Sequence, residues 1–164
     1  MALVYNAHEI YQLGIEIEKN GKAFYTACAK TTKDETVKDL CEDLSSWEEE
    51  HVATFEKLKS QLPKDARLLD SYDPDDKLQL YLKAVAGTHV FVVNRDVDTV
   101  LATANTPAKI LATALAFEKD SVVVYTTMMR LVPDDLGKRS LEKIIEEELQ
   151  HISIITQKMA AVKS

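Results

Sequence analysis

One short stretch decides the fold of this chain: EEELQHI, at residues 146–152, which has a near copy in SWEEEHVATF, at residues 46–55. Each stretch contains Glu-x-x-His, formed by Glu148 and His151 in one and by Glu48 and His51 in the other. A charge run on a helix usually faces solvent, so one such motif would carry little information. The two motifs lie one hundred positions apart, which indicates an internal repeat.

The repeat includes two further glutamates. Glu18, in EIEKNGKAFY, lies thirty positions before Glu48, and Glu118, in AFEKDSVVVY, lies thirty positions before Glu148. Every member of the first set therefore returns one hundred positions later. Repetition at a fixed period is typical of a duplicated structural unit, and here it indicates a duplicated helical hairpin.

Composition limits what the repeat can build. A chain of 164 residues, 46% apolar and 29% charged, is typical of one soluble globular domain, so we expect residues 1–164 to form a single domain. The net charge of -7 argues against nucleic acid or an anionic membrane as a partner. No basic residues lead an apolar segment at the start, and no apolar run approaches the roughly 18 residues of a membrane span, so we expect a cytoplasmic location. Cys28 and Cys41 form no Cys-x-x-Cys pair, and we expect both to be small buried residues.

Apolar periodicity and stop signals predict four long helices. The first covers residues 3–29, and the second runs from about Glu35 to about residue 62, where Pro63 stops it. Thr32 and Glu35 are candidates for a capping box between them. Thr106 and Pro107 read as the N-cap and first residue of a third helix that ends near residue 131. A fourth helix follows VPDD and continues almost to the C-terminus.

These helices predict an all-α fold: two hairpins, at about 3–62 and 107–163, joined by a long crossover at 63–106. Asp73-Pro74 and Gly87 would begin and end a short extra helix around LQLYLKAV in the crossover. The segment THVFVV, at 88–93, could be a strand in isolation, but with no second strand to pair with we expect it to be helical or extended.

The spacing places the repeated glutamates at one level of the bundle. Residue 33 is the midpoint of the first pair and residue 133 that of the second, so each pair lies about 22 Å from its own interhelical turn. Both Glu-x-x-His motifs fall within apolar helical stripes and should point inward. Their neighbours Glu49, Glu50, Glu146 and Glu147 should face solvent or lie just outside the site.

Four carboxylates buried together would repel one another, so a positive charge must lie among them. Two metal ions meet this need. A glutamate from each of two helices and Glu-x-x-His from each of the other two is the ligand set of four-helix di-iron and di-manganese sites. Oxygen-rich ligands with imidazole favour iron first and manganese second, with zinc as a possible substitute. The predicted ligands are Glu18, Glu48, His51, Glu118, Glu148 and His151.

The segments IEKNGKAFY and FEKDSVVVY, with the paired Glu-x-x-His motifs, resemble the ferritin-like di-iron superfamily and, within it, the rubrerythrin-related proteins. The resemblance covers nearly the whole chain and implies a ferritin-like four-helix bundle with two iron ions per chain. It implies a homodimer or higher homo-oligomer that reduces peroxide, or oxidises ferrous iron with peroxide or oxygen. Tyr25 and Tyr125, each seven residues after a ligand glutamate, match tyrosines close to such sites. No cysteines for a fused rubredoxin domain are present, so the electron donor would be a separate protein.

One position departs from that resemblance. Rubrerythrins with peroxidase chemistry resemble one another in a further glutamate three residues after the third-helix ligand, where this chain has Ser121 and, in the first repeat, Gly21. We expect these small residues to leave a symmetric site with room for a small oxidant. Whether peroxidase turnover survives is left open, and the alternatives are a ferroxidase or iron-storage protein, or a metal that only stabilises the bundle.

Three other residues are not expected to bind metal. His8 and His89 have no acidic partner at ligand spacing, and each should be a surface or capping residue. Trp47 should pack against a neighbouring helix or subunit.

Overall fold

A computed structural model describes residues 6–64, 66, 77–88 and 96–162, and in these parts of the chain it is all-helical, as predicted. Its helices are α1 (Ala7–Thr31), α2 (Glu35–Gln61), α3 (Lys77–Thr88), α4 (Val97–Thr103), α5 (Pro107–Leu131) and α6 (Lys138–Ala161), with a 3₁₀ turn, η2 (Asp134–Leu136), before α6. Among the described residues there is no strand.

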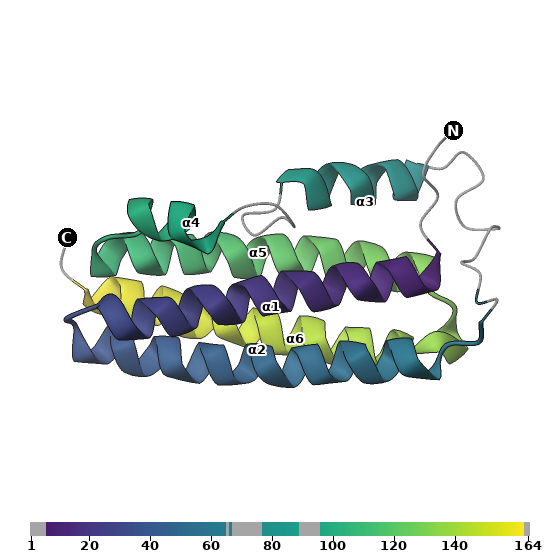
Figure 1. Ribbon diagram of the computed structural model, residues 1–164, viewed down its shortest axis with the longest axis horizontal. Helices are drawn as coiled ribbons and strands as arrows, with labels where there is room; N and C mark the ends of the chain where they lie inside the picture. The colour runs from purple at the N-terminus through teal and green to yellow at the C-terminus, as the bar shows by residue number, and fades with distance from the viewer. Residues whose placement is uncertain (1–5, 65, 67–76, 89–95, 163–164) are drawn as a thin grey trace.

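Four long helices form a bundle of two antiparallel hairpins, α1 with α2 and α5 with α6 (Figure 1). Packing is most extensive within each hairpin, and the hairpins meet along α1 with α5 and α2 with α6. The crossover helices cover one side of the bundle, because α3 packs on α5 and α4 packs on α1. The side formed by α2 and α6 carries no such layer of described residues (Figure 1).

The helix starts follow from side-chain caps. Asn6 and Glu9 form a capping box at α1, and the Thr106 hydroxyl accepts the backbone N–H of Lys109 at α5, as Thr106-Pro107 indicates. The capping box predicted for α2 from Thr32 and Glu35 is wrong. Asp34 caps α2, because its carboxylate accepts the N–H groups of both the second and third helical residues.

A tight connection between α5 and α6 depends on Gly137. Its φ of 109° lies in the left-handed region that favours glycine. A methyl group there would also lie 2.6 Å from a methyl carbon of Leu58 and 2.8 Å from the Tyr11 hydroxyl. The Tyr11 hydroxyl donates a hydrogen bond to the carbonyl of Leu136, so the start of α6 is held against α1.

Parts of the crossover lie outside the described residues. They include Asp73-Pro74, His89 and most of THVFVV. Residues 1–5, ahead of α1, also lie outside the described residues. The predicted short helix is present as α3, in which Gly87 lies within the last turn rather than just beyond it.

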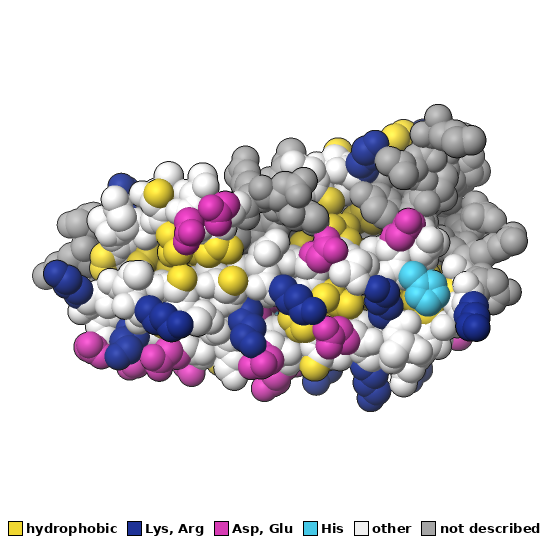
Figure 2. Space-filling view, in the orientation of Figure 1, with side chains coloured by type: hydrophobic (Ala, Val, Ile, Leu, Met, Phe, Trp, Pro, Cys, Tyr) yellow, Lys and Arg dark blue, Asp and Glu magenta, His cyan; other side chains and the backbone are white. Residues whose placement is uncertain are grey.

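Charged side chains of both signs are interspersed over the surface formed by α1 and α2 (Figure 2). No helix among the described residues is both long enough and apolar enough to cross a membrane.

Candidate metal centre

The six predicted ligands come together at one level of the bundle. They form two overlapping groups, in each of which one ligand atom per residue lies within 4.8 Å of the others. The groups are Glu18, Glu48, His51 and Glu148, and Glu48, Glu118, Glu148 and His151. Two glutamates, Glu48 and Glu148, belong to both groups, so each can bridge two ions. Each group takes residues from both hairpins.

The helices position these side chains by burying the stripes that contain them. Leu44 and Phe55 flank the motif on α2, and Leu141 and Ile155 flank it on α6, and all four are buried. All four glutamates are fully buried, and His51 and His151 are only 3% and 5% exposed. By contrast, Glu49, Glu50 and Glu146 are exposed, as predicted for the neighbours of the ligands.

The site contains buried polar atoms without hydrogen-bond partners, which bound cations would satisfy. Six buried side-chain atoms there have no hydrogen-bond partner in the described part of the chain: Oε2 of Glu18, both carboxylate oxygens of Glu48, Nδ1 of His51, Oε2 of Glu118 and Oε1 of Glu148. Leaving such atoms unpaired is costly, and metal coordination is one of the few ways to satisfy four buried carboxylates at once. The donor set, rich in oxygen with two imidazoles, fits iron or manganese.

Without a metal, the site must retain protons. Burial raises the pKa of Glu48 and Glu118 well above the ordinary value, and the carboxylates that face them add to the rise. Burial opposes ionisation of Glu148 as well, but interactions with Glu118 and both histidines lower its pKa below the ordinary value. Burial alone would lower the pKa of His151, but Glu118 and Glu148 beside it raise that pKa to about 9. Neighbouring carboxylates raise the pKa of His51 in the same way.

Each of the two tyrosines donates a hydrogen bond to a glutamate of the other hairpin. Both lie close to the site, as the resemblance implied. Tyr25 on α1 donates to Glu118 on α5, with 2.6 Å between the oxygens, and Tyr125 on α5 donates to Glu18 on α1. Burial, followed by the facing carboxylates, raises the pKa of both phenols well above the ordinary value. Both hydroxyls therefore remain protonated donors.

Further aromatic rings pack on the two tyrosines that bond to the carboxylates. Phe24 and Phe117 pack on Tyr25, with ring centroids 5.4 and 5.8 Å away, and Phe55 packs on Tyr125 at 5.2 Å. The space that we expected beside Gly21 is filled, because a methyl group there would lie 2.4 Å from the end of the Phe117 ring.

At position 121, the counterpart of Gly21, the side chain is a buried serine, which supplies no carboxylate.

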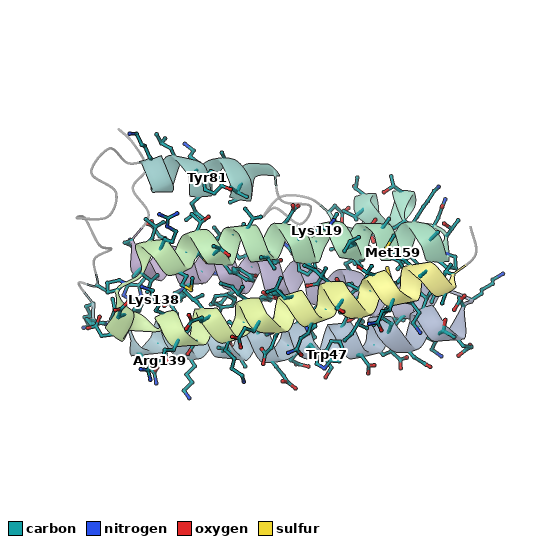
Figure 3. All side chains as sticks on the ribbon, turned by 180° about the vertical axis from the view of Figure 1, so that it is seen from behind. Trp47, Tyr81, Lys119, Lys138, Arg139 and Met159 are labelled. Carbon is teal, nitrogen blue, oxygen red and sulfur yellow. The ribbon has the colours of Figure 1, made fainter. Side chains whose placement is uncertain are left out.

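The two histidine rings have different neighbours outside the group of carboxylates. His51 Nε2 lies 3.1 Å from Oε2 of Glu147, whereas the ring of His151 stacks on Trp47, with centroids 4.8 Å apart and planes at 11°. Figure 3 shows Trp47 between α2 and α6. These contacts agree with the expectation that Trp47 packs against a neighbouring helix and that Glu147 lies just outside the site, but the sequence did not predict that either residue contacts a histidine. The signal available was that Trp47 and Glu147 occupy the same position of the repeat, four residues before a histidine.

A surface pocket leads to this side of the site. Its volume is about 250 Å³, and its lining comes from α2 and α6. It is lined by Trp47, Glu50, His51, Glu147, Gln150, His151 and Ile154. A small molecule in this pocket would meet the edges of both ligand histidines.

Other candidate residues lie away from the site. The Nε2 atom of His8 is 3.0 Å from the carbonyl oxygen of Pro63, in the connection that follows α2. Cys28 and Cys41 are free and buried, as predicted.

No protein-family model matches the chain, and no curated protein is similar enough to count as a relative. A solved structure does resemble it: a protein from Thermotoga maritima that is described as a ferritin-like diiron-carboxylate protein. The TM-score is 0.68, the sequences are 20% identical, and the match covers 95% of each chain. At this identity the likeness shows the fold alone, and that fold is a ferritin-like helical bundle.

Proposed function

We propose that this protein is a di-iron carboxylate oxidoreductase of the rubrerythrin type, which reduces peroxide or dioxygen. The observation that supports this most strongly is the sharing of Glu48 and Glu148 between two complete ligand groups. A metal that only stabilised the bundle would need one such group. Two ions held by common carboxylates lie close enough for each to give one electron to the same small molecule.

Each residue of the site has a distinct part in this proposal. Glu18 and Glu118 would each hold one ion, Glu48 and Glu148 would lie between the two, and His51 and His151 would supply one nitrogen each. A ferrous pair bound there would supply two electrons, which with two protons reduce peroxide to two waters or dioxygen to peroxide, and a separate donor must return the electrons.

The surrounding residues control geometry and access. Tyr25 and Tyr125 fix one oxygen of Glu118 and of Glu18, which leaves the other oxygen of each facing the site. The aromatic rings keep water from the carboxylates, and the pocket between α2 and α6 admits a small oxidant.

Ser121 favours a second candidate function, oxidation or binding of ferrous iron without peroxide turnover. Its side chain is buried one turn after Glu118 and carries no carboxylate that could exchange with a histidine on oxidation. Such a site would oxidise its irons and be reduced again slowly.

Anaerobic loading distinguishes these functions. The metal-free protein is titrated with ferrous iron, and we expect two ions per chain. Peroxide or oxygen is then added in separate arms, and absorbance follows iron oxidation over repeated cycles with a chemical reductant. Rapid oxidation with many cycles supports the oxidoreductase, whereas a single oxidation supports the second candidate. Binding of fewer than two ions per chain contradicts both.

Ser121→Glu tests the role of the missing carboxylate. If its absence limits peroxide chemistry, the variant should be oxidised by peroxide faster than the parent, and its histidine coordination should change on oxidation. Equal rates and unchanged ligands in both proteins would show that residue 121 has no such role.

A further inference from the structure

The two halves of the centre differ at one repeated position. Glu147 on α6 and Trp47 on α2 each lie four residues before a ligand histidine, and each contacts the histidine of the opposite helix. The six ligands themselves repeat without change at an interval of one hundred residues. The two halves of the centre therefore share their candidate ligands but differ in the residue that contacts each histidine from outside.

Glu147 holds His51 at the nitrogen that faces away from the carboxylates. Nδ1 of His51 lies 3.2 Å from Oε1 of Glu148 and points into the site, while Nε2 lies 3.1 Å from Oε2 of Glu147. The other oxygen of Glu147 lies 3.3 Å from Nζ of Lys143, one helical turn away. A hydrogen bond from Nε2 to this carboxylate fixes the tautomer that leaves the Nδ1 lone pair for a metal, and it makes that nitrogen a better donor.

Trp47 holds His151 in a different way. Nδ1 of His151 lies 3.0 Å from Oε2 of Glu148 and 3.5 Å from Oε2 of Glu118, so this ring also presents Nδ1 to the site. Its face is covered by the half-buried indole. An indole has one N–H donor and no acceptor, so Trp47 can restrain the ring by packing but cannot accept its outer N–H.

We propose that the two metal positions have unequal affinity, with Glu147 as a positioning residue that makes the His51 position the tighter one. The ion held by Glu18 and His51 binds first, and the ion held by Glu118 and His151 binds second. Loss of a carboxylate that supports a ligand histidine lowers metal affinity by about 10–100-fold, which sets the expected gap between the two steps. This inference rests on the proposed dinuclear centre.

Stepwise binding of Co²⁺ to the metal-free protein tests it. Visible absorption from coordinated cobalt and calorimetry together give the affinity of each step. We expect two steps that differ by at least about tenfold. His51→Ala should remove the tighter step and His151→Ala the weaker one, which assigns each step to its position.

Glu147→Gln then tests the positioning role. It should weaken the tighter step by about 10–100-fold, so that the two steps merge, with the weaker step unchanged. Glu146→Gln is the matched control, because this neighbouring glutamate is exposed, and it should change neither step.

Trp47→Glu makes the first hairpin like the second at this position. It should tighten the weaker step by about 10–100-fold, since His151 gains an acceptor for its outer N–H. Trp47→Phe keeps a stacked ring but adds no acceptor, so it should not tighten the weaker step. Circular dichroism and urea unfolding of the metal-free variants check that each one is folded.

Two failures can be told apart. If the parent binds no cobalt, or one ion only, the dinuclear centre itself is wrong. If it binds two ions equally, or if neither Glu147→Gln nor Trp47→Glu changes one step more than the other, the inequality is wrong and the dinuclear centre stands. A Glu147→Gln variant that does not fold leaves the decision to Trp47→Glu.

Discussion

Tyr25 donates a hydrogen bond to Glu118, a residue ninety-three positions away on another helix, rather than to Glu18 on its own helix. Tyr125 makes the equivalent bond in the opposite direction, because its hydroxyl donates to Glu18. Each hairpin therefore orients a candidate metal ligand of the other through a buried phenol. These two bonds tie α1 to α5 at the level of the metal ligands.

Tyr25→Phe should weaken both the fold and the site. The variant leaves a buried carboxylate oxygen of Glu118 without its donor, and we expect the free energy of unfolding to fall by about 1–3 kcal/mol, measured by urea denaturation. The affinity for metal should fall as well. Tyr11→Phe is the control, because its hydroxyl bonds to the Leu136 carbonyl, away from the ligands. A similar fall in metal affinity in both variants would contradict the specific role of Tyr25.

Replacing a glutamate that belongs to both ligand groups should lower the number of metal ions bound per chain more than replacing a glutamate that belongs to one. Glu48 belongs to both ligand groups and Glu18 to one. Elemental analysis after loading and desalting should therefore find about one ion per chain in Glu18→Ala, and well below one in Glu48→Ala. The prediction fails if the two variants retain the same amount of metal.

Metal-free protein should lose stability as the pH rises from about 6.5 to 9. The pKa of His151 is about 9 in the folded state, whereas a histidine in an unfolded chain has its pKa near about 6.5. Between these values the folded state holds the proton more tightly than the unfolded state, so deprotonation on raising the pH disfavours folding. The raised pKa values of Glu48 and Glu118 act in the same direction above the carboxyl pKa of the unfolded chain.

Bound metal replaces these protons, so the loaded protein should not show this loss. Thermal unfolding of both forms at pH 6, 7.5 and 9 measures the effect, at values chosen to span roughly the interval between the two histidine pKa values. We expect the difference in Tm between loaded and metal-free protein to widen toward pH 9. A difference that stays constant or narrows would mean that these groups do not hold protons in the metal-free fold.

Gly21→Ala should destabilise the bundle. A methyl group there would lie 2.4 Å from the Phe117 ring, which packs against Tyr25 beside the site. Such overpacking typically costs about 1–3 kcal/mol, more than alanine gains over glycine in a helix. Gly87→Ala is the matched control, since its methyl group would meet nothing within 4 Å, and it should stabilise the protein by up to about 1 kcal/mol. Equal effects of the two substitutions on urea unfolding would refute the packing argument.

Sequence alone could predict which six candidate ligands come together, because their meeting depends on helix register. Equal thirty-residue spacings place Glu18 with Glu48 and Glu118 with Glu148 wherever two helices form a hairpin, and the apolar stripes turn them inward. The hundred-residue repeat then supplies the second half of the site. No detail of how the hairpins face one another is needed for this step.

What the sequence could not predict depends on how the helices face one another. Tyr25 reaches Glu118, and Trp47 stacks on His151, only because of the rotation and spacing of α1 against α5 and of α2 against α6. The position of Phe117 over Gly21 depends on the same packing. The cap of α2 was missed for a local reason, since Thr32 and Asp34 both precede the helix and only Asp34 is close enough to reach two of its free N–H groups.

The division of each ligand group between two hairpins has a consequence for the order of folding. Each hairpin joins helices that are neighbours in sequence, whereas bringing the two hairpins together requires the long crossover to close, and distant contacts of this kind form later than local ones. A hairpin that has formed but not docked carries two glutamates and one histidine open to water, too few ligands to retain an ion tightly. Docking is therefore the event that assembles the site, so a metal ion that binds there would be captured by the finished bundle and would have no part in guiding the chain toward it.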